Sequence, residues 1–168
     1  MNVSQLLLEL FGRIPPLVAD AVDGLEPDQL VERPAEGANT VGWLLWHLAR
    51  VQDDHVGEIL GEEQVWVVGD WPSRFGLEPD PSNTGYGHSA DEVLSVRPDG
   101  AAAITGYLDA VQQRTVTMVR GLTPDELDRL VDEGWDPPVT LGVRLVSIAD
   151  DGLQHVGQAA YVKRLVGG

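Results

Sequence analysis

The sequence predicts an all-α protein, a four-helix bundle with a long irregular connection between the second and third helices. Apolar residues recur in alternating steps of four and three in four long segments, as on a helix face packed against neighbouring helices. No segment of any length alternates apolar and polar residues as a β-strand does. Residues 62–98 instead contain Gly, Pro, Asn and Ser throughout. We expect one domain over residues 1–168, because this length can enclose a sizeable core.

The first amphipathic segment runs from Val3 to Ala21 and predicts a helix of about 20 residues. Pro15 and Pro16 fall inside it. A proline within a helix costs about 3 kcal/mol or more and usually kinks it. We therefore expect either a bend there or two abutting helices. Residues 25–39, which contain proline and glycine, are predicted to form a connection.

The second helix is expected to extend to about Leu60. Asn39 or Thr40 can cap its first turn with a side-chain oxygen, and Gly61 is typical of the position just after a helix. One stripe of this helix changes from apolar to polar along its length, and His47 stands at the change. The members of this stripe are Leu44, His47, Val51, Asp54 and Glu58.

The irregular region, residues 62–98, contains four aromatic residues, Trp66, Trp71, Phe75 and Tyr86. Long loops inside compact domains are often functional lids. The simplest interpretation is that these rings pin the loop to the bundle, and the alternatives are a substrate wall or a dimer contact. Within the region, Ser89 and Glu92 have the spacing of a capping box, which predicts a short helix.

The second half of the chain contains the third and fourth long helices. The third is expected to begin at Pro98 or Asp99 and to end near Leu122. Thr123-Pro124-Asp125-Glu126 has the pattern of a helix start, which predicts a short helix to about Val131. Residues 134–138 break the chain. Thr140 can cap the final helix, which is expected over residues 141–166.

Composition argues against several classes of function. A net charge of −16 disfavours nucleic acid and anionic membranes as partners, because both require a basic surface. The chain has no cysteine and therefore no disulfide, no cysteine zinc site and no cysteine nucleophile. Its N-terminus does not resemble a signal peptide, and no apolar run is long enough to cross a bilayer. We expect a cytoplasmic protein with neither a nucleic-acid nor a membrane partner.

The final helix places a polar pair inside its apolar seam. The seam consists of Leu141, Leu145, Ile148, Gly152, His155, Ala159, Val162 and Val166. Asp151 lies one turn before His155, so the two side chains face the same direction. A carboxylate and an imidazole in such a seam must be paired or bound to a ligand. With His47, they can form a two-histidine, one-carboxylate metal site with open coordination positions.

Other interpretations of these polar residues remain open on spacing alone. Asp151 can simply orient a core histidine through a hydrogen bond, with His47 at a polar end of the bundle. Asp54 and His55 are alternative ligands or neighbours of the site, although a solvated position also suits them. His88 is expected to be an ordinary loop histidine, unless the loop closes as a lid over the site.

Three motifs resemble the DinB-like superfamily, and more narrowly the actinobacterial proteins grouped with mycothiol-dependent enzymes such as maleylpyruvate isomerase. The motifs are Thr40-Val-Gly-Trp-Leu-Leu-Trp-His47-Leu-Ala, Pro138-Val-Thr-Leu-Gly-Val-Arg144-Leu-Val and Asp151-Gly-Leu-Gln-His155-Val-Gly-Gln158. The resemblance covers essentially the whole chain. It implies a four-helix bundle that holds a divalent metal through His47, Asp151 and His155. Asp151 departs from the family pattern, in which Glu or His is usual, and its side chain is one methylene shorter than that of Glu.

The resemblance further implies that the metal binds a small-molecule thiol, mycothiol in actinobacteria, and that the thiol attacks an electrophile. The expected activity is that of a thiol-dependent S-transferase or isomerase. Metal binding would deprotonate the thiol, whose free pKa is about 8.5. The donor set suits zinc, nickel and iron(II) equally. A homodimer formed through an exposed helix face is also implied.

Two alternative functions use the same bundle. The first is a metal-dependent hydrolase, in which metal-bound water is the nucleophile. The second is a non-catalytic bundle that binds a small ligand, which loss of the metal through Asp151 would favour. In the thiol-dependent enzyme, Arg144 can hold a substrate carboxylate or form a surface ion pair. Gln158 lies three residues after His155 and can donate a hydrogen bond to a metal ligand, touch the bound molecule or serve in packing. Asp54 is the third residue expected near the ligand.

Overall fold

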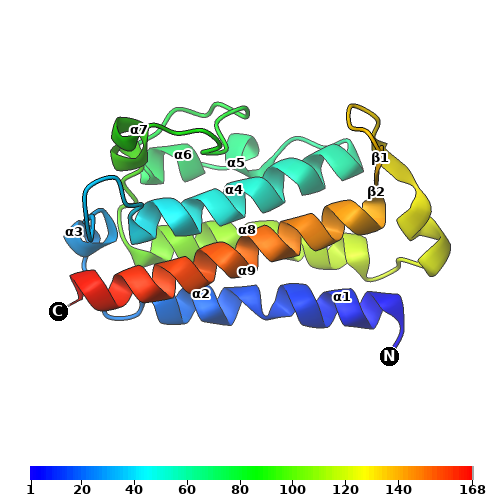
Figure 1. The fold of residues 1–168 in the computed structure, drawn as a ribbon, viewed down its shortest axis with the longest axis horizontal. Helices are drawn as coiled ribbons and strands as arrows, with labels where there is room; N and C mark the ends of the chain where they lie inside the picture. The colour runs from blue at the N-terminus through cyan, green and yellow to red at the C-terminus, as the bar shows by residue number, and fades with distance from the viewer. Residues whose placement is uncertain (168) are drawn as a thin grey trace.

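A computed structural model describes residues 1–167, so that Gly168, the last residue of the expected domain, lies outside the described residues. It confirms the all-α class and the four-helix bundle (Figure 1). The helices are α1 (Val3–Gly12), α2 (Ile14–Val22), α3 (Pro27–Leu30), α4 (Val41–Leu60), α5 (Val65–Val68), α6 (Trp71–Arg74), α7 (Ala90–Ser95), α8 (Ala101–Val119) and α9 (Leu141–Val166). Between α8 and α9 lie a 3₁₀ helix, η1 (Pro124–Asp128), and two strands, β1 (Leu130–Asp132) and β2 (Val139–Thr140).

The long connection crosses the length of the bundle. Figure 1 shows α4 and α8 running in one direction, while α2 and α9 run in the other. Because α4 and α8 are parallel, the chain between them must return along the bundle, and α5, α6 and α7 lie on that return path. We call this connection, residues 62–98, the crossover segment. A crossover connection of this kind is a known variant of the four-helix bundle.

The first helix is divided into two abutting helices, α1 and α2, which meet at Arg13. Pro15 and Pro16 occupy the first turn of α2, where the missing N–H groups would have had no helical partner. At the start of α2, Ile14 packs closely on α9. A Cβ atom built at Gly152 would lie 3.0 Å from Cδ1 of Ile14. Glycine at position 152 therefore permits α2 and α9 to approach each other closely.

Helix α4 begins and ends where the sequence predicts, and it occupies the centre of the molecule. The Thr40 side chain accepts a hydrogen bond from the Trp43 N–H at 3.0 Å, and Gly61 closes the helix with a left-handed φ of 67°. Residues 41–50 are all buried, because α9 and α8 cover two sides of α4 and the crossover segment covers a third. Such all-round burial is typical of a helix inside a core.

Aromatic residues attach the crossover segment to the bundle. Trp66 and Phe75 are fully buried and pack around Tyr107 of α8, with ring centroids 5.3 and 6.1 Å from it. Trp71 lies 5.7 Å from the same ring. Tyr86 differs from the other three, because 92% of its surface is exposed. Trp66, Trp71 and Phe75 therefore attach the crossover segment to the bundle, and Tyr86 does not.

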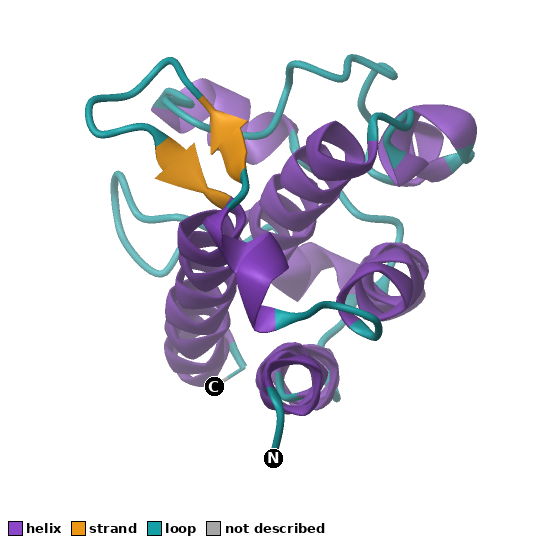
Figure 2. Cartoon of the chain, turned by 90° about the vertical axis from the view of Figure 1, so that its right-hand side faces the viewer, coloured by secondary structure: helices purple, strands orange, loops and turns teal. Residues whose placement is uncertain are grey.

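The region between α8 and α9 differs from the sequence prediction. The expected short helix to Val131 is a 3₁₀ helix that ends at Asp128, and β1 and β2 then pair antiparallel at the end of the bundle that faces the viewer in Figure 2. The sequence shows no strand-like alternation here, because strands of three and two residues are too short to display it. Helix α8 also ends at Val119, three residues before Leu122.

The described part of the chain contains no helix with the length and apolarity that a bilayer crossing requires.

Candidate metal centre

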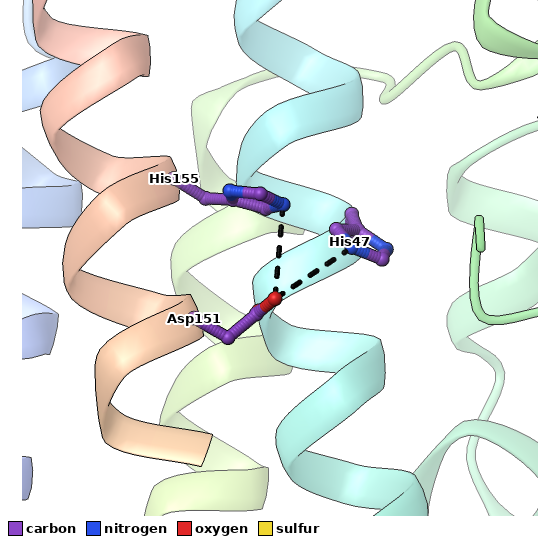
Figure 3. Close-up of side chains that lie close together, drawn as sticks. All are labelled: His47, Asp151 and His155. Carbon is purple, nitrogen blue, oxygen red and sulfur yellow. Dashed lines mark ion pairs between the residues drawn. The ribbon is translucent and has the colours of Figure 1, made fainter. Parts of the chain in front are cut away.

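His47 from α4 meets Asp151 and His155 from α9 where these two helices lie side by side (Figure 3). Oδ1 of Asp151 lies 4.0 Å from Nε2 of His47 and 3.8 Å from Nε2 of His155. The three side chains offer one donor atom each, all within 4.8 Å of one another. The structure thus brings together the three residues that the sequence nominates as metal ligands.

The surroundings of His47 fix its ring and its tautomer. Trp43, one turn earlier on α4, stacks on the imidazole with a centroid distance of 4.7 Å and an angle of 14°. Nδ1 of His47 lies 2.5 Å from the backbone carbonyl oxygen of Thr84. Since a carbonyl only accepts, Nδ1 carries the proton and donates it. Nε2 therefore presents its lone pair to the site, which is the form that binds a metal ion.

Burial keeps His47 neutral. Loss of solvent contact lowers the pKa of this imidazole and outweighs the Thr84 carbonyl and the Asp151 carboxylate, which both raise it. The neighbouring imidazoles of His155 and His88 lower the pKa further. A neutral imidazole is the state from which a metal ion is bound without first displacing a proton.

Asp151 and His155 are held less completely than His47. Oδ2 of Asp151 and Nδ1 of His155 are both buried, and neither atom has a hydrogen-bond partner in the described part of the chain. A buried polar atom without a partner costs about 1–3 kcal/mol. The atoms that approach one another across the cluster, Oδ1 of Asp151 and Nε2 of His47 and His155, are 3.8–4.0 Å apart. This separation is too long for a hydrogen bond, so these donors are available to a ligand.

The donor set and its spacing fit a divalent metal ion. Two imidazoles and a carboxylate suit zinc, nickel or iron(II), and three protein ligands leave positions open for other molecules. Two ligand atoms bound to one tetrahedral ion at about 2.1 Å are about 3.4 Å apart. The carboxylate–imidazole distances are 3.8 and 4.0 Å, and the three donor atoms all lie within 4.8 Å of one another, so the side chains must move inward to share an ion.

A pocket of about 350 Å³ opens beside the cluster. His47 and Asp151 form part of its wall, and Arg144 and His55 form another part. Tyr86 from the crossover segment and Trp135 from the turn between β1 and β2 also line it, and both are largely exposed, at 92% and 67%. Solvent-exposed aromatic rings beside a pocket are an unusual use of surface and suit contact with a ligand.

Arg144 is fixed in the pocket wall by two partners. It donates through Nη2 to a carboxylate oxygen of Asp132 at 2.5 Å, and β1 places that carboxylate. Nη1 lies 3.3 Å from Nε2 of His55, which must accept because a guanidinium only donates. The ion pair expected for Arg144 is thus formed with Asp132, and it is half-buried at the pocket. The Arg144 Nε is buried and has no hydrogen-bond partner among residues 1–167.

The remaining candidate residues lie at different distances from this pocket. Asp54 lines it and accepts a hydrogen bond from Gln64 at 2.7 Å, and burial raises the pKa of the Asp54 carboxyl. Gln158 lies on the exposed side of α9 and is not among the residues that line the pocket. His88 accepts from the Trp43 indole and pairs with the Asn83 side chain, so both of its ring nitrogens are occupied by structural contacts.

A second, larger groove lies away from the cluster. It has a volume of about 780 Å³ and runs between the end of α2 and the second half of α9. None of its described lining residues is a histidine. Size alone would favour this groove, but the donor atoms that can perform chemistry lie beside the smaller pocket.

Sequence reasoning missed three contributors to the site. Thr84 acts through its backbone carbonyl, which gives no signal in a sequence. Gly85 has a φ of 91°, and a Cβ atom there would lie 2.8 Å from Nδ1 of His47, so only glycine fits. Trp43 stands four residues before His47, and this helical spacing could have identified it as a neighbour of the ring.

Fold and site together define a helical bundle with a candidate centre of two histidines and one carboxylate. The chain belongs to the DinB superfamily, whose family model matches residues 11–159. A crystal structure described as a conserved protein from Enterococcus faecalis is similar, with a TM-score of 0.90 and 30% sequence identity. The similarity covers 99% of this chain and 98% of that chain. Comparison with curated proteins gives no match.

Proposed function

We propose that this protein is a divalent-metal-dependent S-transferase or isomerase that joins a small-molecule thiol, such as mycothiol, to an electrophile. The observation that supports it best is the cluster of His47, Asp151 and His155 beside the pocket of about 350 Å³. Three protein donors leave coordination positions open, and the pocket gives a second molecule access to them.

The chain must obtain its thiol from solution, because it contains no cysteine. A divalent ion supplies Lewis acidity, which makes a thiol lose its proton near neutral pH. In the net reaction the thiol gives up that proton and its sulfur bonds to an electrophilic carbon. In a transfer, the leaving group departs with its electron pair and takes up a proton. In an isomerisation, the thiol adds to a double bond and is later eliminated.

Protein residues around the pocket orient the reactants. His47, held by Thr84 and Trp43, presents a lone pair in a fixed direction. Arg144, already ordered by Asp132 and His55, can offer an N–H donor to an anionic group of the electrophile. Tyr86 and Trp135 provide apolar surface for the rest of the ligand. Each of these residues acts by holding a reactant in place, which is a substantial part of catalysis.

The first test is elemental analysis of protein purified without an affinity tag, with wild type beside His47→Ala. We expect about one zinc, nickel or iron per wild-type chain and a loss of that metal in the variant. His88→Ala is the matched control, because His88 lies near the same tryptophans but both of its nitrogens are already occupied. Wild-type protein that stays free of metal after incubation with zinc or nickel would contradict the proposal and favour a non-catalytic ligand-binding bundle.

A second test separates thiol chemistry from hydrolysis. Metal-loaded protein is given an alkyl halide with and without mycothiol, and thioether and halide release are both measured. We expect product only when the thiol is present. Product formation from an ester or amide in the absence of thiol would instead identify the metal-dependent hydrolase, for which water is the nucleophile.

A further inference from the structure

Arg50 is a fully buried arginine whose surroundings connect it to the candidate metal centre. It lies one turn after His47 on α4, and none of its surface is accessible. Nε donates to the carbonyl oxygen of Asn83 at 3.0 Å, and Nη2 donates to that of Pro81 at 2.9 Å. Both acceptors belong to residues 81–85, the segment that also includes Thr84.

The same segment contacts the His47 ring directly. The carbonyl of Thr84, the residue next to Asn83, accepts from Nδ1 of His47. Gly85 lies so close to the ring that a Cβ atom would approach Nδ1 to 2.8 Å and the Trp46 ring to 2.8 Å. The 81–85 segment therefore fits against His47 at one end and is held by Arg50 at the other.

Other contacts of Arg50 explain why it can hold this segment rigidly. Nη2 also donates to the Gln64 side chain at 2.8 Å, and Nη1 lies 3.2 Å from the Tyr107 hydroxyl and 3.5 Å from Asp53. All three nitrogens of the guanidinium are thus used. A planar group with several fixed donors can orient two carbonyls at once, which a lysine ammonium cannot do with the same geometry.

We propose that Arg50 is a positioning residue for the metal centre, which acts through the 81–85 segment to hold His47 in its Nδ1–H tautomer. The metal-binding part of this inference rests on the proposed function, but the tautomer part does not. Partners that orient a metal-binding histidine usually change metal affinity 10–100-fold when they are removed. Here the partner is a backbone carbonyl, so Arg50, which fixes that backbone, is the side chain whose replacement reveals the effect.

The test compares Arg50→Lys with wild type by two measurements. Long-range ¹H–¹⁵N spectra of histidine-labelled, metal-free protein report the tautomer of His47. Titration with Zn²⁺ against a chromophoric chelator reports the dissociation constant. We expect wild type to show the Nδ1–H form, and Arg50→Lys to show a mixture with the Nε2–H form and a dissociation constant about 10–100-fold higher.

Two further variants keep the test decisive. Thr115→Val removes a fully buried hydroxyl that contacts Gln52 but neither Arg50 nor the 81–85 segment. It should lower the melting temperature while leaving the tautomer and the Zn²⁺ dissociation constant unchanged. Gly85→Ala should push the segment off the ring and reproduce the effects of Arg50→Lys without altering Arg50. It decides the role of the segment even if Arg50→Lys does not fold.

Three results would overturn the inference. These are a wild-type tautomer in folded Arg50→Lys, unchanged Zn²⁺ affinity in both Arg50→Lys and Gly85→Ala, or an equal loss of affinity in Thr115→Val, which would mean that stability alone is responsible. If wild type binds no Zn²⁺ at all, the proposed function fails, while the tautomer comparison still accepts or rejects the positioning role of Arg50.

Discussion

Helix α4 carries two polar clusters, and they differ in how completely their atoms are paired. Toward the crossover segment, Asp53 is fully buried and accepts from the Val65 and Trp66 backbone N–H groups at 2.8 and 2.7 Å and from the Tyr107 hydroxyl at 2.8 Å. Toward α9, the cluster of His47, Asp151 and His155 leaves two buried atoms without a hydrogen-bond partner within the described chain.

The difference separates a cluster suited to ordering the core from the candidate metal centre. In the first cluster the Arg50 guanidinium and the Asp53 carboxylate use all their polar atoms in hydrogen bonds, and burial keeps the pKa of Tyr107 well above its usual value, so that its hydroxyl stays protonated and donates. A fully satisfied network of this kind orders a core. In the second, the unpaired atoms belong to residue types that bind metals, and the cluster borders a pocket. The second cluster therefore fits the proposed metal site better than a structural role.

The largest effect on stability is expected for Asp53→Ala. The substitution leaves Arg50 buried without its carboxylate and removes acceptors from two backbone N–H groups. Loss of one partner of a buried ion pair costs about 3–5 kcal/mol of the free energy of unfolding. Urea denaturation of metal-free protein measures it. Asp54→Ala, which removes a half-buried carboxylate with one hydrogen bond, is the control and should cost about 1 kcal/mol; equal costs would show that the first cluster is not special.

The opposite pattern is expected for Asp151→Asn. This change keeps the shape of the side chain and removes the charge, so Zn²⁺ affinity should fall at least about 100-fold, or about 2.7 kcal/mol. The stability of the metal-free protein should stay the same or rise, because an unpaired buried oxygen is no longer part of a carboxylate. Calorimetry with and without Zn²⁺ measures both. Asp151→Glu retains the carboxylate and should retain binding. A large loss of stability in metal-free Asp151→Asn would place this cluster in the structural class.

The sequence predicted the parts of the fold that depend on local chemistry. Thr40 and Thr140 cap α4 and α9, and Gly61 ends α4, because capping needs only residues within one turn. The alternation of four and three identified the helix faces that meet in the core. It also placed Asp151 and His155 on one side of α9, from which their approach to His47 follows once α4 and α9 are neighbours.

Features that depend on distant segments escaped the sequence. Arg50 and Asp53 are buried only because the crossover segment folds back over a third side of α4, and no local pattern shows that cover. Thr84 contributes a backbone atom whose position follows from that same return path. The pairing of β1 with β2, which brings Asp132 to Arg144, joins two strands too short to be recognised by periodicity.

The smallest expected effect on stability concerns His55, which lies in the pocket wall and belongs to neither cluster. Burial, followed by the charge of Arg144, lowers the pKa of this imidazole below its ordinary value of 6.5, while Asp54 and Glu58 oppose the shift. As the pH falls below 6.5, the unfolded chain binds a proton that the folded chain refuses, so the free energy of unfolding decreases until the pH passes the folded pKa.

Denaturation of metal-free wild type and His55→Gln at several pH values between about 5 and 8 tests this effect, since the other titrating groups are common to both chains. Wild type should lose more stability on acidification than His55→Gln, by a modest amount because 26% of the His55 side chain is exposed. Identical pH dependence in the two proteins would mean that Arg144 accommodates a second positive charge 3.3 Å away. In that case the pocket would accept cations as readily as anions, and the role proposed for Arg144 would fail.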